Sequence, residues 1–380
     1  MISILGGEII SALGDKVSRQ QHLYHGTFQH TLRDVDVIGE RQTVPYYAIN
    51  SDLACPDLFD PMPALKQLVQ QAINQLGLGS AALARCGLFI GNAANDLSLS
   101  IPLGINQDGK QIETINRERI GNGYYAQQLI THFGLNSLTL TYNTACTSSS
   151  NAIIDAAAML EGKLIDYALV IGMEMYAPLS FEGFISMQLL APQAISPFDS
   201  ERQGLILGES ISGLFLSRDE VAPSEWRFLG GSSRCETHSV TGVNPDGSGI
   251  AEVINSALNI SAVTPSDVTA VKAHGTASRL SDLAEINGMK QVFSEQPDFY
   301  SLKPYIGHTL GSCGVSELLL SIECIDAGFL PPTPNFLHPD PEMMWQPISS
   351  TRHCEHGVFV HNCFGFGGNN SVMVVEKVAS

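Results

Sequence analysis

A strand-to-helix junction in the first half of the chain decides the fold, and it reads LTLTYNTACTSSSNAIIDAAAML at 138–160. The residues at 138–142 predict a strand, and the Ala- and Ile-rich stretch beyond them predicts a helix that leads to a second strand at 167–172. Cys146 lies where the first strand ends and the helix begins. The helix dipole and unpaired N–H groups at that point favour the nucleophilic thiolate. The alternative for an isolated cysteine is a small buried apolar side chain.

A second junction of similar design follows later, where VTAVKAHGTAS at 268–278 runs from a predicted strand into a helix at 280–290. It places His274 where the first junction places Cys146. We therefore expect an α/β fold of two duplicated halves, residues 1–225 and 226–380, which meet near VAPSEW. Because open α/β sheets bind ligands beyond the carboxyl ends of their strands, both side chains are expected at one site.

Two elements before the first junction are also clear from local pattern. Apolar residues from Ala64 to Leu76 recur on one helical face, with Pro63 suited to the first turn and Gly77 to the C-terminal stop. The stretch GLFIGNA at 87–93 predicts a buried strand. Strand-like and helix-like segments alternate along the rest of the chain, which is typical of α/β layers.

The segment KPYIGHTLGSCGVSE at 303–317 adds a second candidate histidine, His308, next to Gly307. A cysteine nucleophile with histidine partners is a route to covalent catalysis, and two neutral imidazoles could stabilise an enolate. Lys303 could organise the hydrogen bonds of such a site, with Glu317 as its buried counter-charge. Taken singly, these residues are also compatible with a core histidine, a surface lysine and a solvated helix glutamate.

The Gly-rich stretch NCFGFGGNN at 362–370 precedes a strand, SVMVVEK, rather than a helix, so it does not fit a dinucleotide-binding loop. A turn whose backbone N–H approaches a substrate carbonyl fits better, as a donor of an oxyanion hole. The close spacing in RHCEH at 352–356 matches no standard zinc site, and no metal is expected.

Composition excludes several classes of protein. Acidic residues outnumber basic ones 38 to 20, which gives a net charge of −18 and argues against nucleic-acid binding. No apolar run reaches the length of a membrane span. Charged residues make up only 15% of the 380-residue chain, against about 25% in average globular proteins, so we expect another subunit to cover part of the surface. The eight cysteines include no CxxC pair and no signal peptide is evident, which indicates reduced thiols in the cytoplasm.

In this order, the motifs resemble those of the β-ketoacyl-acyl carrier protein synthases, decarboxylating condensing enzymes of the thiolase superfamily. TACTSSS resembles the nucleophile motif, AHGTAS the first histidine motif, KPYIGHTLGSCGVSE the lysine, second-histidine and glutamate segment, and GFGGN the closing turn. SPFDSERQGLILGE at 196–209 and PPTPNFLHPDP at 331–341 are supporting matches. The resemblance implies the five-layer αβαβα thiolase fold, a dimer, and an acyltransferase without a bound cofactor.

The resemblance also implies roles for single residues. Cys146 would take an acyl group from the phosphopantetheine arm of an acyl carrier protein, with the N–H groups of Cys146 and Phe366 receiving the oxyanion. His274 and His308 would then bind the malonyl thioester oxygen as decarboxylation leaves an enolate. Lys303 and Glu317 would support the histidines. Gly365, Phe366 and Gly367 would gate the pocket and bind the oxyanion. Thr276 and Thr309 would contact the substrate.

Several positions depart from the family pattern. Ala277 and Ser278 stand where Gly and Thr are usual, Asn369 replaces Thr, and Cys235 stands where an acidic residue is expected. Further departures are Ser196, Ser210 and Ser212. Carrier proteins are acidic, yet the segment SDLACPDLFDPMPALK at 51–66 contributes Asp52, Asp57 and Asp60 and no base before Lys66, which leaves Arg202 and Arg279 as candidate docking residues.

Three functions remain compatible with the sequence. The first is a condensing enzyme that elongates acyl chains in fatty acid or polyketide synthesis. The second is a subunit like a chain length factor in a heterodimer with another ketosynthase; the short chain also resembles ketosynthases of aryl-polyene gene clusters. The third is an acyltransferase that does not decarboxylate, against which the second histidine argues. Homodimer and heterodimer both remain open, as do the length and type of the acyl chain, and residues 173–188 could line its pocket, a dimer seam or the core.

Overall fold

The computed structural model describes residues 1–28, 30–37, 40–49, 60–94 and 121–379. Its central feature is a mixed sheet of ten strands. The strands of the first half, in sheet order from the edge, are β5 (Thr139–Tyr142), β4 (Cys86–Gly91), β6 (Tyr167–Glu174), β7 (Ser210–Arg218) and β1 (Ile2–Ser11). Those of the second half, from the centre outward, are β8 (Trp226–Cys235), β14 (Asn369–Lys377), β13 (Gly357–Gly365), β9 (Val268–Lys272) and β10 (Asp298–Tyr300).

The two halves of the sheet have the same design. In each, the three strands at the outer edge are parallel, and the two toward the centre are antiparallel to their neighbours. The halves join through a short antiparallel contact between β1 and β8, with Ile2 opposite Phe228 and Ile4 opposite Trp226. The repeated strand order and direction show the duplication that the sequence predicted, whereas the division of the chain at residue 225 stays a prediction.

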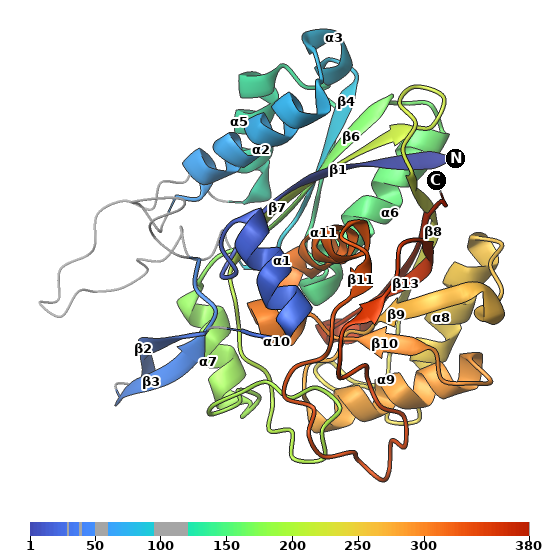
Figure 1. Ribbon diagram of the computed structural model, residues 1–380. Coiled ribbons are helices and arrows are strands. Elements are labelled where there is room, and N and C mark those ends of the chain that lie inside the picture. Colours follow the sequence, from blue (N-terminus) through green and yellow to red (C-terminus); the bar gives the residue numbers. More distant parts are fainter. Residues whose placement is uncertain (29, 38–39, 50–59, 95–120, 380) are drawn as a thin grey trace, which may run out of the picture.

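The helices form three layers around the sheet (Figure 1). The central layer contacts both halves of the sheet, so the sheet wraps around it; its members are α6 (Ser148–Glu161) and α11 (Cys313–Asp326). One outer layer lies over the first half and consists of α2 (Met62–Leu76), α3 (Ser80–Leu83) and α5 (Asn122–Phe133). The other lies over the second half and consists of α8 (Ser248–Ile260) and α9 (Arg279–Val292). These are the five αβαβα layers expected.

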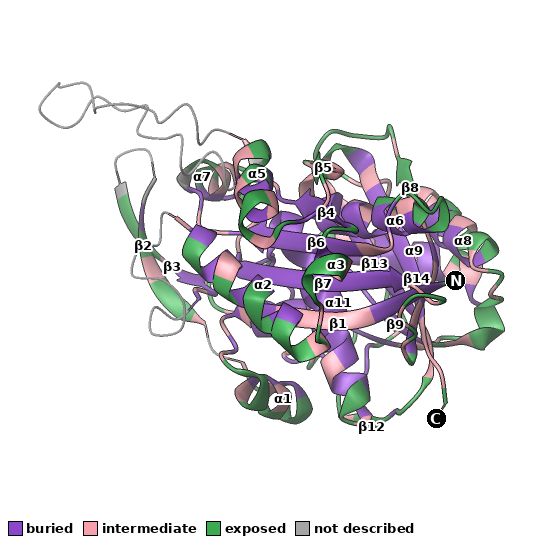
Figure 2. Cartoon of the chain, turned by 90° about the horizontal axis from the view of Figure 1, so that it is seen from above, coloured by how far each residue is buried: buried purple, intermediate pink, exposed green. Residues whose placement is uncertain are grey.

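Shorter elements complete the fold. They are α1 (Lys16–His25), α7 (Pro178–Ser186), α10 (Lys303–Ile306), the pair β2 (Thr31–Val37) and β3 (Glu40–Tyr46), and the pair β11 (Phe329–Leu330) and β12 (Arg352–His353). Figure 2 shows β6 and β7 almost wholly buried, whereas β1 is partly exposed and α2 and α3 keep an exposed outer face. Within the described residues, none of the helices combines the length and apolarity that a bilayer crossing requires.

Local sequence explains the elements that frame the site. The predicted helix is α2, whose apolar face is buried and which ends at Gly77 with a left-handed φ of 64°. The predicted strand at 87–93 is β4, which is buried throughout. Gly91 at its end packs directly on α6: a Cβ there would lie 2.3 Å from the backbone nitrogen of Ser149, so only glycine allows this approach.

One prediction about the duplication is wrong in detail. The sequence paired the junction of Cys146 with that of His274, yet Cys146 follows the edge strand β5, whereas His274 follows β9, the second strand from the opposite edge. The counterpart of β5 is β10, so the helix equivalent to α6 is α11, which follows His308. Local sequence does not show which strand of a unit lies at the sheet edge, because long-range pairing decides it.

Candidate active site

Cys146 lies in a tight turn between β5 and α6. The turn is a short 3-10 segment, Ala145–Thr147, and Ala145 has a φ of 53°, in the left-handed region that non-glycine residues rarely adopt. Ser148, Ser149 and Ser150 are fully buried at the start of α6. Their small side chains let Gly314 of α11 approach, where a Cβ would lie 2.2 Å from the nitrogen of Ser150. This packing holds the turn, and with it the Cys146 thiol, at the centre of the molecule.

Burial sets the resting state of the Cys146 thiol. Desolvation raises the pKa of the Cys146 thiol to about 12, although the charge of Lys303 and a hydrogen bond from the backbone N–H of Phe366 both act to lower it. The sequence predicted that the helix N-terminus would favour the thiolate. The structure opposes this prediction, because the cost of burying an anion raises the thiol pKa and the resting thiol is protonated near neutral pH.

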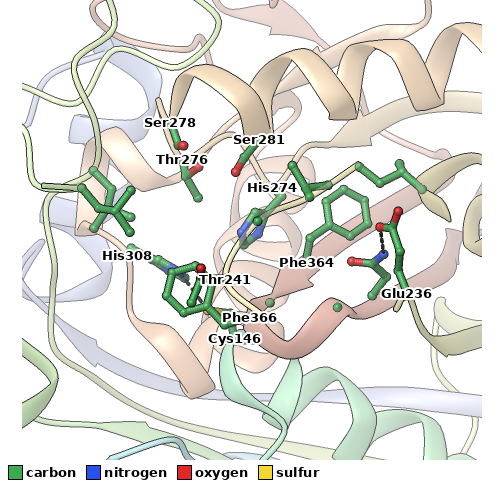
Figure 3. A pocket seen from close by; sticks show the side chains of 18 of the residues that line it. Cys146, Glu236, Thr241, His274, Thr276, Ser278, Ser281, His308, Phe364 and Phe366 are labelled. Carbon is green, nitrogen blue, oxygen red and sulfur yellow. Dashed lines mark hydrogen bonds between the residues drawn. The ribbon is translucent and has the colours of Figure 1, made fainter. Parts of the chain in front are cut away.

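The two histidines converge on this thiol (Figure 3). Nε2 of His308 lies 3.1 Å from Sγ of Cys146. The ring of His274 packs edge-on against that of His308, with ring centroids 5.5 Å apart. Burial, assisted by the charge of Lys303, lowers the pKa of each histidine well below 6.5. Both imidazoles are therefore neutral near pH 7, and each can donate one N–H bond.

Behind the histidines lies a buried ion cluster. Lys303 Nζ is 2.6 Å from one carboxylate oxygen of Glu317, as the sequence expected, and Lys272 Nζ is 2.5 Å from the other. Burial alone would raise the pKa of Glu317, but the two lysines outweigh it and lower that pKa to about 2. Sequence reasoning missed Lys272. Its signal was a charged residue at the end of the apolar strand β9, two positions before His274.

The Gly-rich turn closes the site from the opposite side. A Cβ on Gly365 would lie 3.0 Å from the backbone nitrogen of Cys146, so a glycine here lets the turn approach Cys146, and the N–H of Phe366 bonds the Cys146 thiol. The ring of Phe366 stacks on Phe184 of α7, with centroids 5.5 Å apart. Gly367 has a φ of 77° and donates its N–H to the carbonyl of Val240. Gly367 thus holds the turn in place.

A pocket of about 710 Å³, its open mouth included, leads to Cys146 (Figure 3). Thr276 lines it, and so does Phe184 from the segment 173–188; the substrate contact expected of Thr276 stays a prediction. Thr309 does not belong to the lining: it is fully buried, and its hydroxyl contacts the sulfur of Cys313 and the hydroxyl of Ser316. The other lining residues are Leu189, Leu205, Glu236, Thr241, Gly242, Val243, Ile250, Ser278, Ser281, Phe364, Gly368 and Asn370, together with both histidines, Gly365 and Phe366.

Two buried carboxylates that the sequence analysis did not single out shape the loop of His274. Glu285 accepts hydrogen bonds from the N–H groups of His274 and Gly275, at 2.7 and 2.9 Å. Asp282 accepts from the N–H groups of Thr276 and Ala277, both at 3.1 Å. Ala277 itself has a φ of 62°, a conformation that glycine adopts without strain. The departure from the family's usual glycine is therefore accommodated at a conformational cost.

Cys235 and Ser212 are two further departures from the family pattern. Cys235 is exposed and its thiol lies 3.4 Å from the carbonyl of Gly367, while the neighbouring acidic residue, Glu236, lines the pocket. Ser212 donates to the carbonyl of Gly172 at 2.9 Å.

Across the described residues, no three His, Cys, Asp or Glu side chains gather as metal ligands would.

Arg202 is unsuited to docking an acidic partner. It is buried and bonds Asp340 at 2.6 Å and the carbonyl of Arg279 at 2.9 Å. The Arg202 guanidinium is paired with Asp340 inside the fold, whereas Arg279 is exposed at the start of α9. The acidic residues Asp52 and Asp57 lie outside the described residues.

Comparisons with known proteins agree with this geometry. The family models for the N-terminal and C-terminal domains of β-ketoacyl synthases match residues 61–222 and 228–337. The chain is 29% identical to the chloroplast 3-oxoacyl-[acyl-carrier-protein] synthase I of Hordeum vulgare over 80% of its own length and 71% of the relative's. It is 32% identical to the oxytetracycline polyketide putative β-ketoacyl synthase 1 of Streptomyces rimosus, over 62% of its own length and 59% of that relative's.

A solved structure extends the similarity to the whole fold. The complex of the ketosynthase ApeO with its chain length factor ApeC from Xenorhabdus doucetiae contains a chain that matches with a TM-score of 0.82 and 25% identity. The match covers 100% of this chain and 98% of that one. The chain thus has the thiolase fold of the ketosynthases, and it belongs to the β-ketoacyl synthase family of acyltransferases.

Proposed function

We propose that the chain condenses a malonyl unit with an acyl group held on Cys146, releasing CO₂ and lengthening the acyl chain by two carbons. The observation that carries this proposal is the meeting of one thiol and two neutral histidines in a single pocket, with His308 Nε2 3.1 Å from the sulfur. Carrier-bound thioesters are the proposed substrates, delivered on a phosphopantetheine arm that enters the pocket past Thr276.

In the first stage, Sγ of Cys146 loses its proton and attacks the acyl thioester carbonyl. The N–H groups of Cys146 and Phe366 are the proposed donors to the oxyanion, which the hydrogen bond from Phe366 N–H to the Cys146 thiol supports. The bond from the carbonyl carbon to the carrier's sulfur then breaks, and that sulfur takes the proton. The acyl group is left on Cys146.

In the second stage, the carboxylate of malonyl carrier protein leaves as CO₂, and its bonding electron pair moves onto the thioester oxygen. His274 and His308, both neutral, would donate N–H bonds to this enolate oxygen. The enolate carbon attacks the acyl carbonyl, the bond to Sγ of Cys146 breaks, and the departing thiolate takes a proton from the solvent. Lys303 contributes by lowering the pKa of both histidines, which keeps them neutral, and Glu317 contributes by holding Lys303 in place.

Intact-protein mass spectrometry after incubation with an acyl carrier protein tests the first stage. We expect a mass increase of one acyl group, which Cys146→Ala abolishes. Retained labelling of the Cys146→Ala protein would reject this nucleophile. His308→Ala should reduce condensation far more than loading, because only the enolate step needs both histidines. An equal loss of both steps would contradict this division of labour.

A second role is favoured by two observations. A chain of the solved complex of ApeO with its chain length factor matches this chain over its whole length. The net charge of −18 and the burial of Arg202 leave little positive charge for an acidic carrier. We propose that the chain works as one subunit of a heterodimer whose partner shares in carrier docking. Native mass spectrometry with a candidate partner ketosynthase tests this. Acylation of the chain alone at the full rate of the mixture would argue against the need for a partner.

A further inference from the structure

His308 lies between two sulfur atoms. Nε2 faces Cys146 at 3.1 Å, and Nδ1 faces Sγ of Cys313 at 3.2 Å. Cys313 is the first residue of α11 and is fully buried. The substrate pocket reaches Cys146 but is not lined by Cys313. Cys313 therefore acts on the site only through the histidine ring.

The direction of the bond between Cys313 and His308 follows from the other neighbours of the sulfur. Lys303 Nζ lies 3.8 Å from Sγ, and the Thr309 hydroxyl donates to it at 3.5 Å. An ammonium group has only donors, so the sulfur accepts from Lys303 as well as from Thr309. Among the described residues, the nearest acceptor for the thiol proton of Cys313 is Nδ1 of His308 at 3.2 Å, closer than the Thr309 hydroxyl oxygen at 3.5 Å.

This direction determines where the proton of His308 lies. A neutral imidazole that accepts at one nitrogen carries its hydrogen on the other. His308 is neutral because burial lowers its pKa, and Cys313 stays protonated because burial raises the pKa of its thiol well above 9. The hydrogen therefore lies on Nε2, the nitrogen that faces Cys146.

The charged groups around this pair support the same state. Glu317, on the same helix as Cys313, is ionised and bound to Lys303 and Lys272, so it does not compete for the proton of Cys313. The ring of His274 meets His308 edge-on and adds no full charge, because burial keeps His274 neutral. Among the described residues, no carboxylate contacts either nitrogen of His308.

We propose that Cys313 is a positioning residue whose S–H bond to Nδ1 holds His308 in the Nε2–H tautomer that an enolate oxygen requires. The value of this tautomer for catalysis rests on the proposed condensing function. The tautomer itself does not, because it follows from the contacts of the resting site.

Cys313→Ala and Cys313→Ser form the test pair, and Cys324→Ala is the matched control. Cys324 is an equally buried thiol on the same helix, outside the pocket and the ion cluster. The alanine variant lacks a donor for Nδ1, whereas serine supplies an O–H in its place. We expect Cys313→Ala to load acyl groups within about twofold of the unchanged protein but to release CO₂ from malonyl carrier protein about tenfold to a hundredfold more slowly. Cys313→Ser should recover most of that rate.

Three results would overturn the proposal. They are CO₂ release by Cys313→Ala at the rate of the Cys324→Ala control, an equal loss of loading and CO₂ release, and a serine variant that is folded but as slow as alanine. Nitrogen NMR of the ¹⁵N-histidine-labelled, unchanged protein, with His308 assigned by the His308→Gln variant, tests the tautomer without substrate. A protonated Nδ1 would reject the proposal even if the variants fail to fold. Because this spectrum needs no turnover, it separates an error about Cys313 from an error about the reaction.

Discussion

Replacing Glu317 with glutamine should destabilise the protein more than any single change in its two lysine partners. Glu317 accepts from Lys272 at 2.5 Å and Lys303 at 2.6 Å, and all three side chains are buried. A carboxylate pKa lowered from 4.5 to about 2 corresponds to about 3 kcal/mol of stability. Glu317→Gln also leaves two ammonium groups without a counter-charge, so we expect a loss of about 3–5 kcal/mol.

The pH dependence of this loss has a definite sign. Because the folded-state pKa of Glu317 lies below its usual value of 4.5, its contribution is fully present above about pH 4.5 and is lost as the pH falls toward 2. The difference in stability between the unchanged protein and Glu317→Gln should therefore narrow over that range. Urea unfolding monitored by circular dichroism, at neutral pH and at about pH 4, measures it.

Two comparison variants sharpen the experiment. Lys272→Met leaves Glu317 paired with Lys303, so it should cost about 1 kcal/mol, chiefly the hydrogen bond to the carbonyl of Asn362. Lys163→Met removes a lysine from an exposed pair with Glu220 and should change stability by less than about 1 kcal/mol. If Glu317→Gln unfolds at the same urea concentration as the unchanged protein, or Lys272→Met costs as much as Glu317→Gln, the reasoning from charge balance is wrong.

Three further predictions concern the site and its surroundings. Gly365→Ala should slow acylation of Cys146 at least tenfold, measured by intact mass, because the new methyl group lies 3.0 Å from the backbone nitrogen of Cys146; acylation at an unchanged rate would contradict it. The rate of Cys146 alkylation by iodoacetamide, followed by peptide mass spectrometry, should rise steadily from about pH 7 to 10 without a plateau, because burial raises the thiol pKa to about 12. A plateau in this rate near neutral pH would show a resting thiolate. Arg202→Met should lower the free energy of unfolding by about 3 kcal/mol, because it leaves Asp340 and the buried Asp282 without their cation. A urea titration measures this loss. A stability equal to that of the unchanged protein would mean that Arg202 is free for docking.

Local sequence was enough to place the reactive residues on the right elements. The helix α2, the strand β4 and the junctions of Cys146 and His274 follow from apolar periodicity and from the small residues that end each element. Such patterns are local because a helix face or a strand alternation repeats within a few residues. The order of motifs along the chain was specific enough to predict the β-ketoacyl synthase family, which the comparisons confirm.

Features that depend on distant segments were beyond the sequence. Three such features arise from contacts between residues far apart in the chain. They are the equivalence of β5 and β10 at opposite edges of the sheet, the second lysine bound to Glu317, and the burial of Arg202. The protonation of Cys146 was mispredicted for the same reason. A helix terminus acts locally, whereas the desolvation that outweighs it is produced by every segment that covers the thiol. The chain's local pattern therefore determined which groups could react, and tertiary packing alone decided their charge, their hydrogen-bond partners and which nitrogen of His308 faces Cys146.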